Sequence, residues 1–270
     1  MTWAVPGPAF LFCPADRPDR FTKAALAADV VILDLEDGVA PERRDEARAH
    51  LRAASLDPAT TIVRINPASS PDHERDLTTL RETNVTMVML AKTEAPEEVL
   101  ALEEFSVVAL LETPRGVVAA NEIARCANII AVMWGAEDLV AALGGLSSRH
   151  ADRSYRDVAR YARSRTLLAA RAEGRCALDA VCLLLDDLEL QRDEALDAAA
   201  VGFAATVCVH PSQVPVVRAA YRPSDEQLAW AKQILDESRG RAGVFRVGTL
   251  MVDEPVLAQA RQILRRGDVA

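Results

Sequence analysis

Aromatic residues are scarce in this chain, at 4% of its 270 positions, although half of all residues are hydrophobic. A large core must therefore be built from Ala, Val, Leu and Ile, and such side chains suit helices packed on parallel strands. No apolar run approaches the roughly 20 residues that a membrane-spanning helix needs. The first residues also lack a basic segment followed by an apolar stretch, so we expect neither a signal peptide nor membrane contact.

Cysteine is present, but without the spacing of a metal site or a disulfide framework. The five cysteines form no CxxC pair, are odd in number, and several lie inside apolar runs. Thiols in this setting are typical of proteins from a reducing compartment. We therefore expect a cytoplasmic protein. The cysteines are Cys13, Cys126, Cys176, Cys182 and Cys208.

A basic surface is missing as well. The formal net charge is −9 and the pI is near 5.1, which argues against nucleic acid as a partner because such a partner needs a basic face. Local basic pockets for an anionic ligand remain compatible with this balance. The length of 270 residues is long for an average domain but close to the roughly 250 residues of a single (β/α)8 barrel.

Short apolar runs recur between stretches rich in Ala, Arg and Glu. Most of these runs are continuously hydrophobic, as is typical of parallel strands covered on both faces. The eight runs cover residues 9–13, 30–37, 61–66, 86–92, 107–113, 129–134, 177–184 and 206–210. Alternating strands and helices predict right-handed crossovers and a parallel sheet. Eight repeats favour an α/β fold closed into a (β/α)8 TIM barrel over an open doubly wound sheet.

Prolines mark the starts of several predicted helices, because proline suits the first turn of a helix. Helices are predicted at 42–53, 97–104 and 115–126, after Pro41, Pro96 and Pro114.

After residue 210 the sequence shows no further strand-like run of comparable quality. Helices are predicted at 212–220, 225–239 and 252–265, with a glycine-containing link at 240–248. We therefore expect a catalytic barrel at residues 1–220. Residues 221–270 form a C-terminal helical extension that is too short to be an independent domain.

Charged residues follow the apolar runs at five consecutive predicted strand ends. In a (β/α)8 barrel these ends meet at one mouth, where the chemistry of such barrels takes place. A purely structural barrel has no reason to gather charges there, since each costs free energy unless it is paired or binds an ion. The residues are Glu36, Asp37, Arg64, Lys92, Glu112 and Asp138.

Carboxylates without a His or Cys signature suit a hard cation. Mg²⁺ usually takes one or two protein carboxylates and completes its octahedron with water and substrate oxygens. Glu112 and Asp138 fit as such a sparse ligand set. The guanidinium of Arg64 would pair with the carboxylate of a 2-keto acid. Lys92 would add positive charge or stabilise an enolate.

Each of these residues also has a structural alternative. Glu36 and Asp37 could cap the helix near Pro41, and Arg64 could be a partner of either carboxylate. Lys92 could pair with Glu94 alone. Glu112 and Asp138 could form an ion-free network with Arg115.

Six motifs in this order resemble the citrate lyase β-subunit-like (CitE-like) family. This family, with the citramalyl-CoA and malyl-CoA lyases, belongs to the HpcH/HpaI aldolase group of the phosphoenolpyruvate/pyruvate barrel superfamily. A single motif would be weak, whereas the ordered set is specific. The motifs are FCPADRPDR at 12–20, VILDLEDG at 31–38, VRIN at 63–66, ETPRG at 112–116, GAEDL at 135–139 and VHPSQ at 209–213.

The resemblance implies a Mg²⁺ site at Glu112 and Asp138 and carboxylate recognition by Arg64. It also implies a coenzyme A thioester as substrate. Its phosphates would meet the loop at Pro14, Arg17 and Arg20, and Gly135 and Ala136 would line the substrate site together with Glu112.

The segment GTLMVDEP at 248–255 resembles the lid of citramalyl-CoA and malyl-CoA lyases. The resemblance implies a homotrimer in which Asp253 reaches the active site of a neighbouring subunit. Asp253 could equally be the N-cap of the last helix, ahead of Pro255. The chain departs from many relatives at 202–207, GFAATV, where they carry Gly-Lys, so a coenzyme A or acyl-carrier contact at that point is in doubt.

The implied function is Mg²⁺-dependent cleavage of a 3-hydroxyacyl-CoA into a 2-keto acid and acetyl-CoA or propionyl-CoA. Asp37 or Glu36 would act as the base or orient a metal-bound water, and Asp253 would move the carbon-bound proton. Two alternatives are a citrate lyase β subunit acting on citryl-ACP, and a non-catalytic regulator that binds coenzyme A or a nucleotide. The sequence does not distinguish among the candidate acyl chains.

Overall fold

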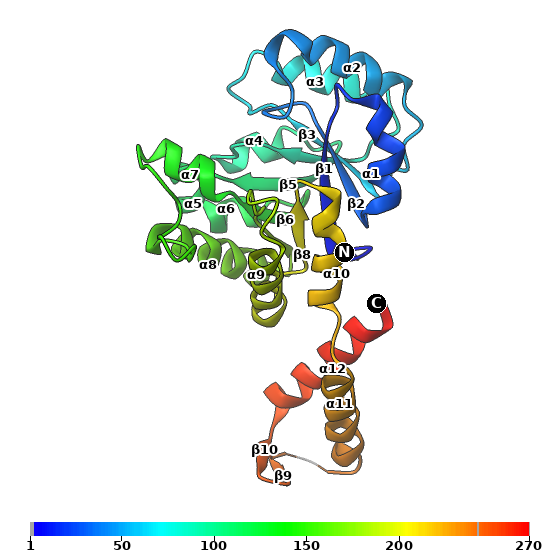
Figure 1. Ribbon diagram of the computed structural model, residues 1–270, viewed down its shortest axis with the longest axis vertical. Helices are drawn as coiled ribbons and strands as arrows, with labels where there is room; N and C mark the ends of the chain where they lie inside the picture. The colour runs from blue at the N-terminus through cyan, green and yellow to red at the C-terminus, as the bar shows by residue number, and fades with distance from the viewer. Residues whose placement is uncertain (1–2, 242, 270) are drawn as a thin grey trace.

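The computed structural model describes residues 3–241 and 243–269 and shows a closed barrel of eight parallel strands in the order β1 to β8. This confirms the predicted (β/α)8 fold (Figure 1). The strands are β1 (Ala9–Pro14), β2 (Val30–Asp34), β3 (Thr61–Ile65), β4 (Met87–Leu90), β5 (Ser106–Leu111), β6 (Ile129–Trp134), β7 (Cys176–Asp179) and β8 (Ala205–Cys208).

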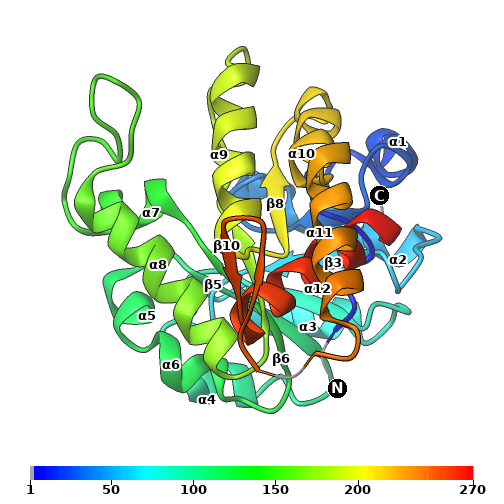
Figure 2. The same ribbon diagram turned by 90° about the horizontal axis from the view of Figure 1, so that it is seen from below.

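Helices surround the strands on all sides when the barrel is viewed along the C-terminal extension (Figure 2). They are α1 (Phe21–Ala27), α2 (Arg44–Ala53), α3 (His73–Leu80), α4 (Pro96–Leu100), α5 (Pro114–Val118), α6 (Ala120–Ala124), α7 (Ala136–Ala142), α8 (Asp157–Ala172), α9 (Leu188–Val201) and α10 (Val214–Tyr221). Short 3-10 turns lie at Pro18–Arg20, Pro41–Arg43 and Pro211–Gln213.

Side chains alternate along each strand between the barrel interior and the layer beneath the helices, as the two-residue period of a strand requires. Phe10, Ile32, Ile62, Met89 and Leu110 belong to the interior core, where they are almost completely buried. Their sequence neighbours pack outward against the helices in a larger core made mainly of Ala, Val, Leu and Ile. The barrel is therefore a packed core, and chemistry is confined to its mouth.

Several elements end earlier than predicted. The strand expected at 30–37 ends at Asp34, that at 86–92 ends at Leu90, and that at 177–184 ends at Asp179. The first ends because the chain turns around the Asp34 carboxylate, which accepts backbone N–H groups from residues 36 and 38. The helix expected at 115–126 is divided at Ala119, whose ψ of 7° departs from the helical value.

All five cysteines are buried and free. Within residues 3–241 and 243–269, no helix combines the length and apolarity that crossing a membrane requires.

The extension is an arm that projects away from the barrel (Figure 1). It contains α11 (Asp225–Ser238), the antiparallel hairpin β9 (Phe245–Val247) and β10 (Leu250–Val252), and α12 (Glu254–Val269). The prediction of helices alone was wrong here, because the hairpin strands are three residues long and carry little pattern. The arm has its own small core around Ala231, Ile234, Val252 and Ala260.

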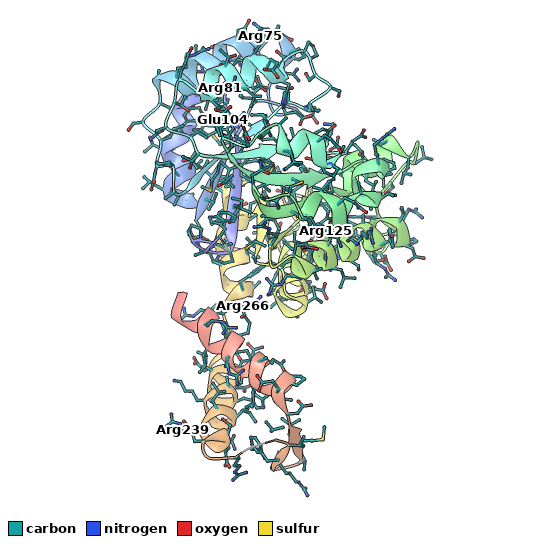
Figure 3. The ribbon with its side chains drawn as sticks, turned by 180° about the vertical axis from the view of Figure 1, so that it is seen from behind. Arg75, Arg81, Glu104, Arg125, Arg239 and Arg266 are labelled. Atoms are coloured by element: carbon teal, nitrogen blue, oxygen red, sulfur yellow. The ribbon has the colours of Figure 1, made fainter. Side chains whose placement is uncertain are left out.

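Arg266 of α12 joins the arm to the barrel, as its place between the two in Figure 3 shows. Its guanidinium donates to the backbone carbonyls of Ala199 at 2.6 Å and Phe203 at 3.2 Å, at the C-terminal end of α9. The last carbonyls of a helix lack intrahelical partners and carry partial negative charge, so a cation suits this place. The guanidinium also lies 5.7 Å from the ring centre of Tyr221. Burial lowers the pKa of Arg266.

We expect Arg266→Ala to loosen the arm. Two charge-assisted hydrogen bonds and a cation–π contact are lost, so the free energy of unfolding should fall by about 2 kcal/mol. Hydrogen exchange should become faster in α11 and α12 while the barrel strands stay protected. Arg265→Ala is the matched control, because Arg265 bonds only Gln262 on the same helix within the described residues. Equal exchange in the two variants would contradict this role of Arg266.

Candidate active site at the barrel mouth

The two-residue period of the strands places three charged side chains inside the barrel mouth. Asp34 continues the inward positions of Val30 and Ile32 on β2, and Arg64 continues that of Ile62 on β3. Glu112 follows β5 two residues after the inward-facing Leu110. Strand register also pairs Asp34 directly with Arg64.

Arg64 is held by carboxylates from β2 and from the turn after it. Its Nε and Nη2 atoms donate to the two oxygens of Asp34 at 2.7 and 2.6 Å, and Nη1 lies 3.2 Å from Glu36 Oε2. The guanidinium also stacks 4.7 Å from the ring centre of Phe12. Burial by itself would lower the pKa of Arg64, but the Asp34 and Glu36 carboxylates raise it overall, so the side chain is a permanent cation.

Asp34 organises the turn that presents Glu36 and Asp37. Its carboxylate accepts the backbone N–H groups of Glu36 at 2.9 Å and Gly38 at 2.8 Å, in addition to the two bonds from Arg64. A Cβ atom on Gly38 would lie 2.3 Å from Asp34 Oδ2, so only glycine allows this close approach. The Asp34 side chain is nearly buried, and sequence reasoning gave it no role. Asp34 lies on the same inward face of β2 as Val30 and Ile32, at even spacing from both, and this spacing could have revealed its position.

Lys92 crosses the mouth from β4 toward the turn after β2. Its ammonium bonds the Glu36 carboxylate, lies 2.9 Å from Asp37 Oδ2 and lies 3.5 Å from Asp138 Oδ1. Its backbone N–H donates to Glu112 Oε1 at 3.0 Å. Burial opposes the charge of the ammonium, but the bonds to Glu36 and Asp37 raise the pKa of Lys92 overall.

Glu112 is 3% exposed and is packed against the backbone of Gly135, which precedes α7. A Cβ atom on Gly135 would lie 2.9 Å from both Cβ and Oε2 of Glu112. Burial, and then the nearby charge of Asp138, raise the pKa of Glu112 to about 8. The two carboxylates are therefore close enough to repel each other. Asp138 itself is 39% exposed and faces the open mouth from the first turn of α7.

The two acids after β2 differ in how accessible they are. Glu36 is nearly buried, and its oxygens bond Lys92, Arg64 and the backbone N–H of Asp37. Burial is the main cause that raises the pKa of Glu36. Burial acts on Asp37 too, but the hydrogen bond from Lys92 outweighs it and lowers the pKa of Asp37. The Asp37 side chain is 59% exposed.

We call the group of carboxylates and cations at this place the mouth cluster. It contains five carboxylates and two cations, so negative charge is in excess when the acids are ionised. The members are Asp34, Glu36, Asp37, Glu112, Asp138, Arg64 and Lys92. Arg64 and Lys92 make their closest contacts with the acids of β2 and its turn. The excess therefore falls on Glu112 and Asp138.

An oxygen-only donor set with excess negative charge fits a hard divalent cation. In the part of the chain that the structure describes, His, Cys, Asp and Glu side chains form no group of three or more arranged to hold an ion. Glu112 and Asp138 would thus be a two-carboxylate site that leaves coordination positions for water and substrate, as Mg²⁺ sites commonly do.

Three of the four structural alternatives for these residues are wrong. Neither Glu36 nor Asp37 caps a helix, since the turn at Pro41 and helix α2 begin without a side-chain cap. Lys92 does not pair with Glu94, whose carboxylate lies 3.4 Å from Arg115. Arg115 is in turn absent from the contacts of Glu112 and Asp138 described above. Arg64 does pair with Glu36, but its main partner is Asp34.

Pro14 ends β1 beside the mouth cluster, since it is in register with Asp34. Arg17 and Arg20 follow in the exposed loop, where Arg17 pairs with Asp19 at 3.2 Å. Ala136 is buried at the start of α7, next to Gly135.

Asp253 is not brought to the mouth of its own barrel. It follows β10 on the arm, where its Oδ1 accepts the backbone N–H of Val256 at 3.3 Å, as a helix N-cap does.

A buried network behind the mouth was missed by sequence reasoning. The fully buried carboxylate of Asp76 on α3 accepts three hydrogen bonds, from the backbone and side-chain N–H groups of Asn66 and from Arg48 Nε. The Asn66 amide also donates to the backbone carbonyl of Leu35 at 3.0 Å. Leu35 stands between Asp34 and Glu36, so the network ties α2 and α3 to the acids of the mouth cluster.

A closed (β/α)8 barrel whose mouth carries an excess of carboxylates has the arrangement of a barrel enzyme, because catalytic residues gather at this end of the fold. Comparison with known families identifies the family of barrel enzymes to which the chain belongs. The family described as HpcH/HpaI aldolase/citrate lyase matches residues 9–211, and the chain belongs to this family.

The chain is similar over nearly its whole length to known proteins. A citrate lyase subunit beta-like protein of Mycobacterium tuberculosis is 58% identical over 264 residues, covering 98% of this chain and 97% of that protein. The mitochondrial citramalyl-CoA lyase of Homo sapiens is 30% identical, covering 95% of this chain and 84% of that protein. The crystal structure of CitE from M. tuberculosis with magnesium, acetoacetate and coenzyme A superposes with a TM-score of 0.94, at 58% identity, covering 97% and 98% of the two chains.

Proposed function

We propose that this protein is a Mg²⁺-dependent carbon–carbon lyase that cleaves a 3-hydroxyacyl-CoA thioester such as citramalyl-CoA or malyl-CoA. The products are a 2-keto acid and acetyl-CoA or propionyl-CoA. The observation that carries the proposal is the excess of carboxylates over cations in the mouth cluster, which falls on Glu112 and Asp138. The relative from M. tuberculosis crystallises with magnesium, a keto acid and coenzyme A, which supports the same ligand set here.

Glu112 and Asp138 would hold Mg²⁺, which when bound lowers the pKa of the substrate hydroxyl and keeps the keto-acid oxygens in place. Arg64 supplies a permanent positive charge for the carboxylate of the keto-acid part. Its Nε and Nη2 atoms donate to Asp34 and its Nη1 atom lies 3.2 Å from Glu36 Oε2, so a substrate carboxylate would share Nη1 with Glu36.

We assign the base to Asp37, because it is the more exposed of the two acids after β2. Asp37 would take the hydroxyl proton, directly or through a water molecule. The O–H electron pair then forms the keto C=O bond, the Cα–Cβ bond breaks, and its electrons pass to the acyl-CoA carbon as an enolate. A proton returns to that carbon, and we assign this transfer to Asp253 of a neighbouring subunit.

The coenzyme A part of the substrate would lie along the loop after β1. Arg17 and Arg20 are the cations of this loop, and both are accessible to phosphate groups. Gly135 and Ala136 would form the floor of the substrate site beside Glu112.

We further propose a homotrimer in the cytoplasm, with residues 1–220 as the barrel and 221–270 as an arm that reaches a neighbour. Helices of a (β/α)8 barrel run antiparallel to its strands, so the arm leaves from the ends of α9 and α10, on the face opposite the mouth. Asp253 therefore needs a second copy to meet a mouth. Apolar side chains at the tip support such docking: Val244, Leu250 and Met251 are 65%, 39% and 62% exposed. A mass of about 88 kDa, three times 29.2 kDa, would be measured by mass photometry.

We expect Gly135→Ala to weaken metal binding. The new Cβ atom would displace Glu112, and losing the support of a ligand commonly costs about 10- to 100-fold in metal affinity. Calorimetric titration with Mn²⁺ measures the change. Gly145→Ala is the control, because its Cβ atom would crowd Val140, away from the mouth cluster. An unchanged affinity for Gly135→Ala would show that Glu112 is not a ligand or tolerates the shift.

The substrate is tested by a coupled assay for keto-acid release from malyl-CoA, citramalyl-CoA, 3-hydroxy-3-methylglutaryl-CoA and citryl-CoA, with and without Mg²⁺. We expect Mg²⁺-dependent release from at least one of these thioesters. Failure with all four, in a folded protein, would overturn the proposal and favour a binding protein.

A further inference from the structure

Lys92 has an unusual backbone for a side-chain-bearing residue. Its φ of +49° lies in the left-handed region, which is typical of glycine. Such a conformation persists only where the surroundings hold it, and it often marks a functional position. The conformation follows the end of β4 and re-aims the residue toward the mouth.

In this conformation Lys92 contacts four carboxylates of the mouth cluster, one through its backbone and three through its side chain. The backbone N–H of Lys92 faces Glu112 Oε1 at 3.0 Å. The ammonium meanwhile crosses to Glu36 and Asp37 and lies 3.5 Å from Asp138. Lys92 is thus in contact with both carboxylates that we assign to the metal, through its main chain at one and through its side chain at the other.

The choice of lysine is also informative. The sequence has only three lysines, Lys23, Lys92 and Lys232, among 31 basic residues. The other cation of the mouth cluster is Arg64, whose rigid fork is fixed by two bonds to Asp34. Lysine is instead a compact charge on a flexible stem, which can release one partner and keep others.

We propose that Lys92 is a positioning residue with two opposed effects on metal affinity: its backbone N–H orients Glu112 as a ligand, and its ammonium competes with the metal for Asp138. The inference rests on the proposed Mg²⁺ site at Glu112 and Asp138. The ammonium neutralises Asp138 while the metal is away and gives it up when the metal arrives, keeping its bonds to Glu36 and Asp37.

The two effects are separable by substitution. Lys92→Met removes the ammonium but keeps the backbone N–H that orients Glu112. Repulsion between an ammonium and a divalent ion a few ångströms apart is large near a protein surface, so its loss should tighten metal binding at least tenfold. Lys92→Val also removes the ammonium but disfavours the left-handed backbone, because a β-branched residue rarely adopts a positive φ. It should therefore bind metal less tightly than Lys92→Met.

The experiment is titration of the full-length protein with Mn²⁺, followed by electron paramagnetic resonance, and with Mg²⁺, followed by calorimetry. We expect Lys92→Met to lower the Kd at least tenfold, whereas Lys92→Arg, which keeps the competing charge, should not lower it. Lys23→Met is the control for net charge, since Lys23 is exposed on α1 and remote from the cluster.

The outcomes separate this inference from the proposed function. If the wild-type protein binds no metal, or binds it equally after Glu112→Gln, the metal site itself is refuted. If the wild-type protein binds metal at that site but Lys92→Met binds it equally or more weakly, only the competing role of Lys92 is refuted. A structural role alone predicts weaker binding after loss of the side chain, so the sign of the change decides.

Discussion

Glu112→Gln is expected to reduce Mg²⁺-dependent carbon–carbon cleavage of the thioester substrate by about a thousandfold or more. The amide has the size of the acid and can still accept the Lys92 backbone N–H. It lacks the negative charge, however, and a metal site with only two protein carboxylates cannot lose one without losing most of its affinity. A thousandfold loss corresponds to about 4 kcal/mol of transition-state stabilisation, which is within the range that a catalytic metal supplies.

The same variant should not be less stable than the wild-type protein when metal is removed. Burial and the charge of Asp138 raise the pKa of Glu112 to about 8, so the folded state binds a proton there more tightly than the unfolded state. Between pH values of about 4.5 and 8 the wild-type protein therefore loses free energy of unfolding as the pH rises. The uncharged amide of the Glu112→Gln variant has no such dependence. The Tm advantage of the variant in a chelator should grow with pH over this range.

Glu94→Gln is the matched control for activity. Glu94 also lies after β4, but it faces the exposed Arg115 at 3.4 Å rather than the mouth cluster. We expect its cleavage rate to stay close to that of the wild-type protein. Comparable losses in the two variants would mean that the effect of Glu112→Gln does not come from a metal ligand.

Asp76→Ala is expected to have the largest effect on stability, a loss of about 3 kcal/mol or more in the free energy of unfolding. Asp76 is completely buried and accepts three hydrogen bonds, and its partner Arg48 is 2% exposed. Arg48 keeps Asp45 and Asp72 as partners, but its Nε and both N–H groups of Asn66 lose their acceptor inside the protein. Breaking a buried charged pair commonly costs about 3–5 kcal/mol. Chemical denaturation measures the difference.

Two further variants separate the buried carboxylate from the surface charges around it. Asp45→Ala removes an exposed partner of Arg48 and should cost less than about 1 kcal/mol. Asp76→Asn keeps one acceptor and should recover part of the loss. Because Asn66 links Asp76 to the Leu35 carbonyl, a folded Asp76→Asn protein should also show a raised KM. A cost for Asp76→Ala as small as that for Asp45→Ala would contradict the network.

The barrel could be predicted because its strands are continuous apolar runs whose spacing repeats eight times. The arm hairpin could not, since strands of three residues leave no pattern in hydrophobicity. At the mouth, the order of the charged residues revealed Arg64, Glu112 and Asp138 as neighbours. Sequence could not show that Asp34, rather than Glu36 or Asp37, is the main partner of Arg64, because that depends on strand register.

Other features of the site depend on tertiary contacts that no local pattern encodes. The left-handed backbone of Lys92 is one, since the stretch around it is apolar and was predicted as strand to residue 92. The link from Asp76 to Asn66 is another, because the acid comes from a helix whose other charged residues are mostly exposed. The two-residue spacing of side chains along β2 would have shown that Asp34 faces inward, since it shares the inward face of Val30 and Ile32.

The central claim is that the mouth cluster breaks a carbon–carbon bond with the help of a metal. Its most direct test is mass spectrometry of all products after the purified protein is mixed with citramalyl-CoA or malyl-CoA, with Mg²⁺ or with a chelator. We predict equal amounts of keto acid and acetyl-CoA with Mg²⁺, and intact thioester with the chelator. Release of free coenzyme A and the unbroken hydroxy acid, or cleavage that continues in the chelator, would contradict it.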